Sequence, residues 1–174
     1  MLEFKKGDLP DMLIFVITIF IFAIGLLIFA YVIPQISLGL ETAGMNSSVG
    51  GQSAIDELTE LGTNGMQKGF LFLFTGFIMG LMISSFLIRT HPIFVFMYII
   101  FLGLTLFLGT YIGNAFEQVA TSSALAATTE TQTYITIIMQ NIVLITLAVG
   151  ALSMIIIFAK FSGVGSGGSS RIWK

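Results

Sequence analysis

The sequence predicts an all-α integral membrane protein with four transmembrane helices joined as antiparallel hairpins. Hydrophobic residues make up 56% of the chain and charged residues 9%, whereas soluble domains carry about 25% charged residues. The apolar residues gather in four runs, each long enough at about 1.5 Å per residue to cross a hydrocarbon core of about 30 Å. We expect spans at about 12–33, 69–88, 92–113 and 133–159 within a transmembrane domain covering 1–162.

The first expected span, 12–33, follows a short polar segment that contains Lys5 and Lys6. Basic residues before an apolar run also begin a secretion signal, but the apolar core of such a signal is only about 7–15 residues long. This run is longer, and its end at Ala30–Pro34 is too bulky for a small-x-small cleavage site. We therefore expect a retained membrane helix, which Pro34 should kink or stop.

Residues 35–68 are expected to form a polar loop. Met45–Gly51 is rich in Gly and Ser, and Ser53 precedes two acidic residues, as the N-cap of a helix would. Apolar residues then recur every third position on one face: Ile55, Leu58 and Leu61. This pattern predicts a two-turn helix, either on the membrane surface or against a neighbour, or an ordinary loop helix that covers the end of the bundle.

Arg89-Thr90-His91-Pro92 separates the second and third spans and forces a turn between them. Each of these spans carries small residues four apart, in the order Gly76, Gly80 and Ser84, then Thr105, Gly109 and Gly113. Such stripes let another helix backbone approach closely. We expect the two spans to pack tightly against each other as a hairpin.

The linker 114–132 lacks Gly and Pro and is expected to extend both flanking helices beyond the lipid. Lys160 should end the fourth span. The remaining residues, 163–174, are a Gly/Ser-rich segment with a basic and aromatic tip, a composition typical of a flexible linker.

In this four-span topology the basic residues are divided unevenly between the two sides of the membrane. One side holds six basic residues: Lys5, Lys6, Arg89, Lys160, Arg171 and Lys174. The other side has Lys68 and six acidic residues: Glu41, Asp56, Glu57, Glu60, Glu117 and Glu130. Basic residues favour the cytoplasmic side, so both termini are predicted to be cytoplasmic.

Several function classes are disfavoured by the composition. The chain has no cysteine and one histidine, so thiolate and multi-histidine metal sites are excluded. None of the four apolar runs contains Asp, Glu, Lys, Arg or His, which argues against a proton pump, an ion-coupled transporter or a voltage sensor. We expect no enzyme activity, no cofactor and no nucleic-acid partner.

A few polar residues are candidates for a role. Gln140 and Asn141 are the most polar members of the fourth run, where they either bond to another helix or line a pore. Arg89 either sets topology or holds a lipid phosphate or a partner's carboxylate, and His91 fits a turn residue. The tail would dock on lipid headgroups or in a protein pocket through three residues: Arg171, Trp173 and Lys174.

Two segments resemble a pattern in small membrane proteins of icosahedral viruses that enclose a lipid bilayer under a protein shell. They are Arg89-Thr90-His91-Pro92-Ile93-Phe94 and, after the following apolar run, Asn114-Ala115-Phe116-Glu117. The resemblance implies a non-enzymatic virion component that shapes the internal membrane. It also implies that the tail links this membrane to the capsid protein.

These observations predict a structural protein that organises a membrane assembly, in a virion internal membrane or a host cell membrane. Its expected partners are the lipid bilayer, copies of itself, other membrane proteins and a capsid protein bound by the tail. An accessory subunit of a cellular membrane complex is the main alternative. A holin-like pore former would need a polar stripe along one helix, and only Gln140-Asn141 is available for one.

Overall fold

The computed structural model describes residues 11–87 and 92–161, and every regular element within them is helical. The elements in chain order are α1 (Asp11–Thr42), a 3₁₀ turn η1 (Met45–Ser47), α2 (Val49–Glu60), a π-helical turn η2 (Leu61–Gly65), α3 (Met66–Leu87), α4 (Pro92–Ala120), α5 (Ala126–Thr131), α6 (Thr133–Gln140) and α7 (Ile142–Phe161). The predictions for Arg89, His91, Arg171, Trp173 and Lys174 lie outside the described residues.

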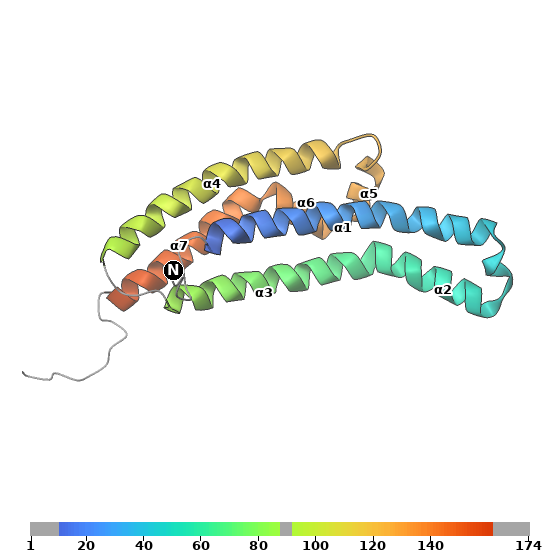
Figure 1. The fold of residues 1–174 in the computed structure, drawn as a ribbon, viewed down its shortest axis with the longest axis horizontal. Helices are drawn as coiled ribbons and strands as arrows, with labels where there is room; N and C mark the ends of the chain where they lie inside the picture. The colour runs from blue at the N-terminus through green and yellow to red at the C-terminus, as the bar shows by residue number, and fades with distance from the viewer. Residues whose placement is uncertain (1–10, 88–91, 162–174) are drawn as a thin grey trace, which may run out of the picture.

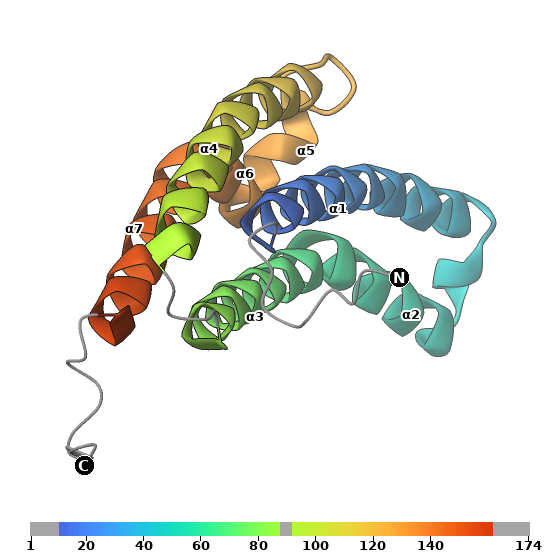
Figure 2. The ribbon, with the colours of Figure 1, turned by 60° about the vertical axis from the view of Figure 1, so that its left-hand side comes forward.

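Four long helices form an elongated bundle (Figure 1). α1 packs against both α3 and α4, and α7 packs against the same two helices (Figure 2). α3 and α4 therefore occupy diagonal corners, and they are not among the pairs that pack along their lengths. The expected tight hairpin between the second and third spans is thus not formed by the described residues of α3 and α4.

Phenylalanine side chains fill the contact between α1 and α3. Phe15 of α1 lies with its ring centroid 6.0 Å from that of Phe74 and 6.2 Å from that of Phe77. Phe70 stacks on Phe74 at 6.3 Å and is fully buried. These rings supply large apolar surfaces and favourable edge and offset contacts, which fix how α1 and α3 lie against each other.

α1 continues nine residues beyond the expected end of the first span, with Pro34 inside it. Proline removes only one helical hydrogen bond, and contacts with neighbouring helices can compensate for that loss. Here the extension packs on α2, where Ile55 is buried and Thr59 Oγ1 donates to Ser37 Oγ at 3.2 Å. Contacts with α2 therefore stabilise the part of α1 that follows Pro34.

Most of the expected loop 35–68 is helical, and Val49–Leu87 runs as one continuous helical stretch of 39 residues. The turn before it needs Gly44, whose φ of 81° lies in the left-handed region. The N-cap of α2 is Ser48, whose Oγ accepts from the Gly51 N–H at 3.1 Å, and not Ser53. The loop is thus a helical hairpin that extends past α4 and α5 (Figure 1).

The fourth expected span is divided into α6 and α7 by a break at Asn141. Among the described residues, four helices are long and apolar enough to cross a membrane: Asp11–Thr42, Val49–Leu87, Val95–Ala120 and Ile142–Lys160. These lengths and compositions support a multi-pass membrane protein.

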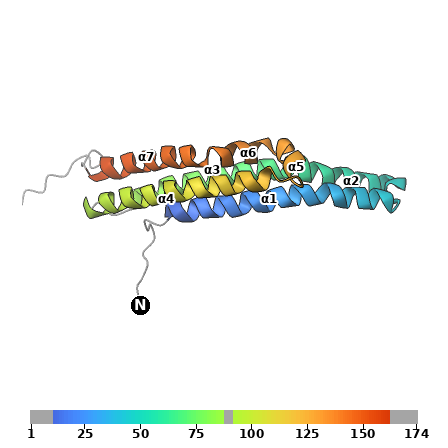
Figure 3. The ribbon, with the colours of Figure 1, turned by 90° about the horizontal axis from the view of Figure 1, so that it is seen from above.

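The start of α1 and the end of α7 lie toward the same end of the bundle (Figure 3), where α3 also ends (Figure 1). Ser84 Oγ of α3 donates to Asp11 Oδ2 at the start of α1. Lys160 Nζ near the end of α7 donates to the Phe86 carbonyl at 2.7 Å. The cytoplasmic placement of this end stays a prediction.

Replacing Lys160 with methionine should lower the free energy of unfolding by about 1 kcal/mol. The Phe86 carbonyl is in the last described turn of α3, where the helix dipole favours a cation. The loss should appear as a lower thermal midpoint in detergent, and Lys160→Arg should retain most of the stability. Lys68→Met is the control, and an equal effect of both methionine variants would contradict the assignment.

Candidate functional site

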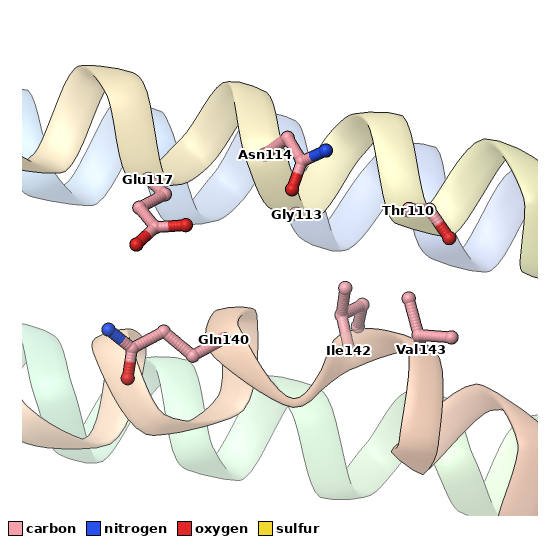
Figure 4. Close-up of a pocket in the computed structure, with 7 residues that line it drawn as sticks. All are labelled: Thr110, Gly113, Asn114, Glu117, Gln140, Ile142 and Val143. Atoms are coloured by element: carbon pink, nitrogen blue, oxygen red, sulfur yellow. The ribbon is translucent and has the colours of Figure 1, made fainter.

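A polar cavity of about 330 Å³ lies between α4 and the junction of α6 with α7 (Figure 4). Its lining residues come from these three helices: Thr110, Gly113, Asn114, Glu117, Gln140, Ile142 and Val143. Glu117 reaches from α4 toward α6, while Ile142 and Val143 reach from α7 toward α4 (Figure 4). Glu117 is the one charged side chain in this lining.

The cavity exists because the helix breaks at Asn141. The Asn141 backbone N–H donates to the Ile137 carbonyl at 3.2 Å, and its side-chain Nδ2 donates to the same carbonyl at 2.8 Å. Asn and Asp side chains compete with helical backbone bonds in this way. The Asn141 amide therefore bonds to the helix that precedes it, and the bond to another helix that its polarity led us to expect is replaced by this local one.

The cavity sits where two apolar segments end together. A Cβ on Gly113, the last residue of the expected third span, would lie 3.6 Å from Ile142 Cγ2, at the first residue of α7. Glu117 is four residues further along α4, about 6 Å beyond at the helical rise. Gln140 precedes the apolar part of α7 and is exposed. Both amides thus lie at the break between α6 and α7, where they interrupt the apolar run 133–159.

The small-residue face of α4 packs against α7. Thr105 is fully buried, and its hydroxyl donates to its own helix at Phe101 O. A Cβ on Gly109 would lie 3.6 Å from Val143 Cγ2. The stripe expected on the third span is therefore a helix contact, with the fourth span as its partner instead of the second.

The small-residue face of α3 has a different setting. A Cβ on Gly76 or Gly80 would meet no atom within 4 Å. Both glycines line a groove of about 230 Å³ between α1 and α3, together with Asp11, Ile14, Phe15, Phe77, Leu81 and Ser84. The described part of the chain leaves this groove unfilled. That Gly76 and Gly80 pack closely against a helix therefore stays a prediction, and the helix would belong to another molecule.

Two buried amides outside the sequence-derived candidates join α2–α3 to α5–α6. Gln67 Nε2 donates to Thr63 O at 3.0 Å and to Thr131 O at 2.6 Å, and its Oε1 accepts from the Tyr134 N–H at 3.2 Å. Gln132 Nε2 donates to Gly62 O at 2.9 Å and to Thr63 O at 3.4 Å. We call Gln67 and Gln132 the amide clamp.

The amide clamp acts on the π-helical turn. Gly62 and Thr63 lie inside η2, whose wider turn moves their carbonyls away from α-helical spacing. Gln132 is 1% exposed, and its Oε1 is buried without a hydrogen-bond partner. Buried carbonyls that are displaced from a helix need hydrogen-bond donors, and an amide side chain supplies two N–H donors. The sequence signal that could have revealed the amide clamp is therefore the presence of glutamines at the edges of the expected spans.

Gly150 of α7 is a further packing site outside the sequence-derived candidates. A Cβ there would lie 2.4 Å from Leu102 Cδ1 and 3.0 Å from Met12 Cε. The Tyr98 hydroxyl donates to the Gly150 carbonyl at 3.2 Å and lies 3.4 Å from Met12 Sδ. Three helices, α1, α4 and α7, thus meet at a glycine that belongs to neither of the two small-residue stripes.

Within the described ranges no group of three or more His, Asp or Glu side chains is placed to hold a metal ion. Comparison with protein-family models, curated proteins and solved structures finds no match to this chain. The proposals below therefore depend on the geometry and on the sequence patterns alone.

Proposed function

We propose that this chain is a structural integral membrane protein that organises a membrane assembly by packing its helices against other transmembrane helices. The supporting observation is the contrast between two similar faces. At Gly109 and Gly113 the small-residue face of α4 lies against α7, whereas a Cβ at Gly76 or Gly80 on α3 would meet no atom of the described residues within 4 Å. Small residues at a membrane helix surface let a second backbone approach closely.

The open face of α3 also carries large side chains that suit such contacts. Exposed residues alternate at spacings of three and four along it: Gly69, Phe72, Gly76, Met79, Ile83 and Phe86. This spacing is that of a helix–helix seam, in which large residues of one helix enter spaces left by small residues of the other. The partner is a copy of the chain or another membrane protein.

The location we propose is the internal membrane of a virion whose bilayer lies under a protein shell. Its support is the resemblance at Arg89–Phe94 and Asn114–Glu117. The tail at 163–174 would then bind the capsid protein. Mass spectrometry of purified particles tests the location, and absence of the chain from particles that contain the major capsid protein would contradict it.

Filling the groove should weaken assembly without unfolding the monomer. In Gly76→Leu and Gly80→Leu, the first added carbon would meet no atom of the described residues within 4 Å, so we expect the thermal midpoint of the monomer to stay near that of the wild type. Close approach of a second helix is then blocked, and we expect at least about a tenfold loss of association, or about 1.4 kcal/mol. Förster transfer between labelled chains in liposomes, or co-purification with the assembly, measures it.

Gly103→Leu is the matched control, since this glycine of α4 is also exposed and a Cβ placed on it would meet no atom within 4 Å. Association should be unchanged in this variant. If Gly76→Leu and Gly103→Leu associate equally well, the open face of α3 is not the contact and the proposed mode of assembly is wrong.

A further inference from the structure

We propose that the polar cavity between α4 and the α6–α7 junction binds the headgroup of a zwitterionic phospholipid that carries a primary ammonium, as phosphatidylethanolamine does. This inference does not depend on the proposed function, because a headgroup site would serve a membrane protein in any assembly. It rests on the position, charge, lining and size of the cavity in Figure 4.

The position matches the headgroup level of a bilayer. In the sequence, an apolar run without charged residues extends from Pro92 to Gly113, and the apolar residues of α7 begin at Ile142. A Cβ built on Gly113 would lie 3.6 Å from Ile142 Cγ2, so the ends of the two runs are adjacent. Glu117, the first charged residue after the run on α4, lies about 6 Å beyond Gly113, at the level where phospholipid headgroups are found.

The lining selects a cation that donates hydrogen bonds. Glu117 supplies the only charge, and oxygen acceptors are available on Asn114, Gln140 and Thr110. A primary ammonium has three N–H donors to satisfy such acceptors. A quaternary ammonium is recognised instead by aromatic cages, and none of the seven lining residues is aromatic. The lining thus favours ethanolamine over choline.

The α7 side suits the phosphate of the same headgroup. Ile142 and Val143, the first two residues of this 20-residue helix, line the cavity. The first turn of a helix carries N–H groups without partners in that helix and the positive end of its dipole. A carboxylate and a helix N-terminus on facing walls complement the two charges of a zwitterion, while the side chains of Ile142 and Val143 offer apolar contact to the lipid below.

The volume is adequate for this ligand. At about 330 Å³ the cavity, which is open on one side, is many times the volume that a single water molecule needs. A phosphoethanolamine headgroup has roughly eight non-hydrogen atoms, so it fits with room for a few waters. A complete phospholipid does not fit, and its acyl chains would lie along the apolar surfaces of α4 and α7.

Native mass spectrometry of the full chain in mild detergent tests the proposal. The protein is offered phosphatidylethanolamine, phosphatidylcholine and phosphatidylglycerol with identical acyl chains. We expect retention of the ethanolamine lipid over the choline lipid by about tenfold, since only the primary ammonium can donate hydrogen bonds to Glu117 and the neighbouring acceptors. Glu117→Gln should abolish this preference. Glu130→Gln, an exposed acid on α5 outside the cavity, should retain it.

Asn114→Leu is a second variant on the same face of α4, and it should lower the preference in part. Thermal midpoints close to that of the wild type establish that the variants are folded. Equal retention of the three lipids, a stronger preference for phosphatidylglycerol, or equal losses in Glu117→Gln and Glu130→Gln would each overturn the proposal. Binding of free phosphoethanolamine without binding of the lipid would also overturn it, because the ligand would then be soluble.

Discussion

Replacing Gln132 with glutamate should destabilise the protein by about 4 kcal/mol at neutral pH, although the two side chains have nearly the same shape. Gln132 is 1% exposed, and its Nε2 donates to the carbonyls of Gly62 and Thr63. A carboxylate would place an acceptor against both carbonyls and would bury a charge without a partner. A shift of about 3 pKa units is typical for such burial and corresponds to about 4 kcal/mol.

The destabilisation should depend on pH in a defined direction. Burial raises the pKa of the introduced carboxyl in the folded state above its value in the unfolded state. The folded protein then binds more protons than the unfolded protein over the interval between the two values, so stability falls as pH rises through it. The Gln132→Glu variant should therefore approach wild-type stability near pH 4 and lose it toward neutral pH.

Thermal unfolding in detergent at pH 4 and pH 7 measures this effect. Gln118→Glu is the control, since it makes the same chemical change at an exposed position of α4. A variant that is equally stable at both pH values, or that matches Gln118→Glu, would show that Gln132 is not held against the π-helical turn.

Replacing Gly150 with leucine should cost about 3 kcal/mol or more. The first added carbon alone would lie 2.4 Å from Leu102 Cδ1 and 3.0 Å from Met12 Cε, so α1, α4 and α7 would have to separate or their side chains would have to repack. Overpacking a core costs about 1–3 kcal/mol for smaller additions. The better helix propensity of leucine offsets less than about 1 kcal/mol of that.

Two further variants separate packing from propensity. Gly103→Leu gains the same propensity in open space, and its stability should equal or exceed that of the wild type. Leu102→Ala should recover part of the loss when combined with Gly150→Leu, which a double-mutant cycle of unfolding free energies detects. Additive effects of the two substitutions would contradict direct contact between these positions.

Hydropathy alone is sufficient to predict four helices long and apolar enough to cross a membrane, and the described residues contain four. The apolar runs are long, and each helix satisfies its own backbone hydrogen bonds in lipid. The stripe of Thr105, Gly109 and Gly113 lies in a helix contact in the structure, as small-residue faces of membrane helices commonly do. Its partner, α7, could not be predicted from chain order.

The segment 35–68 is expected to be a loop because it is polar, follows Pro34 and contains several glycines. In the structure this segment forms the end of α1 and the whole of α2. These helices depend on contacts between residues far apart in sequence, such as Ser37 with Thr59. Local propensity is a weak guide in such cases, since tertiary packing supplies most of the stability of a helix in a protein.

The Gln and Asn side chains show a similar limit to what the sequence can predict. Gln140 and Asn141 stand out in the sequence because they interrupt an apolar run, whereas Gln67 and Gln132, which make the bonds between helices, lie at the edges of the runs. A single sequence reveals where a polar group is unusual in its run. It does not reveal where a helix will widen into a π turn and displace carbonyls that need a donor.

The sequence by itself determined that the surroundings of this protein are lipid and how many helices are long and apolar enough to cross a membrane. Both follow from composition, because the transfer of apolar side chains into lipid depends on hydropathy summed over a run of residues. The tertiary structure alone decided which faces meet: α4 with α7, α1 with two neighbours, and Gln132 with a turn 70 residues away. Those choices depend on shape and on hydrogen-bond geometry between distant segments, for which hydropathy carries no information.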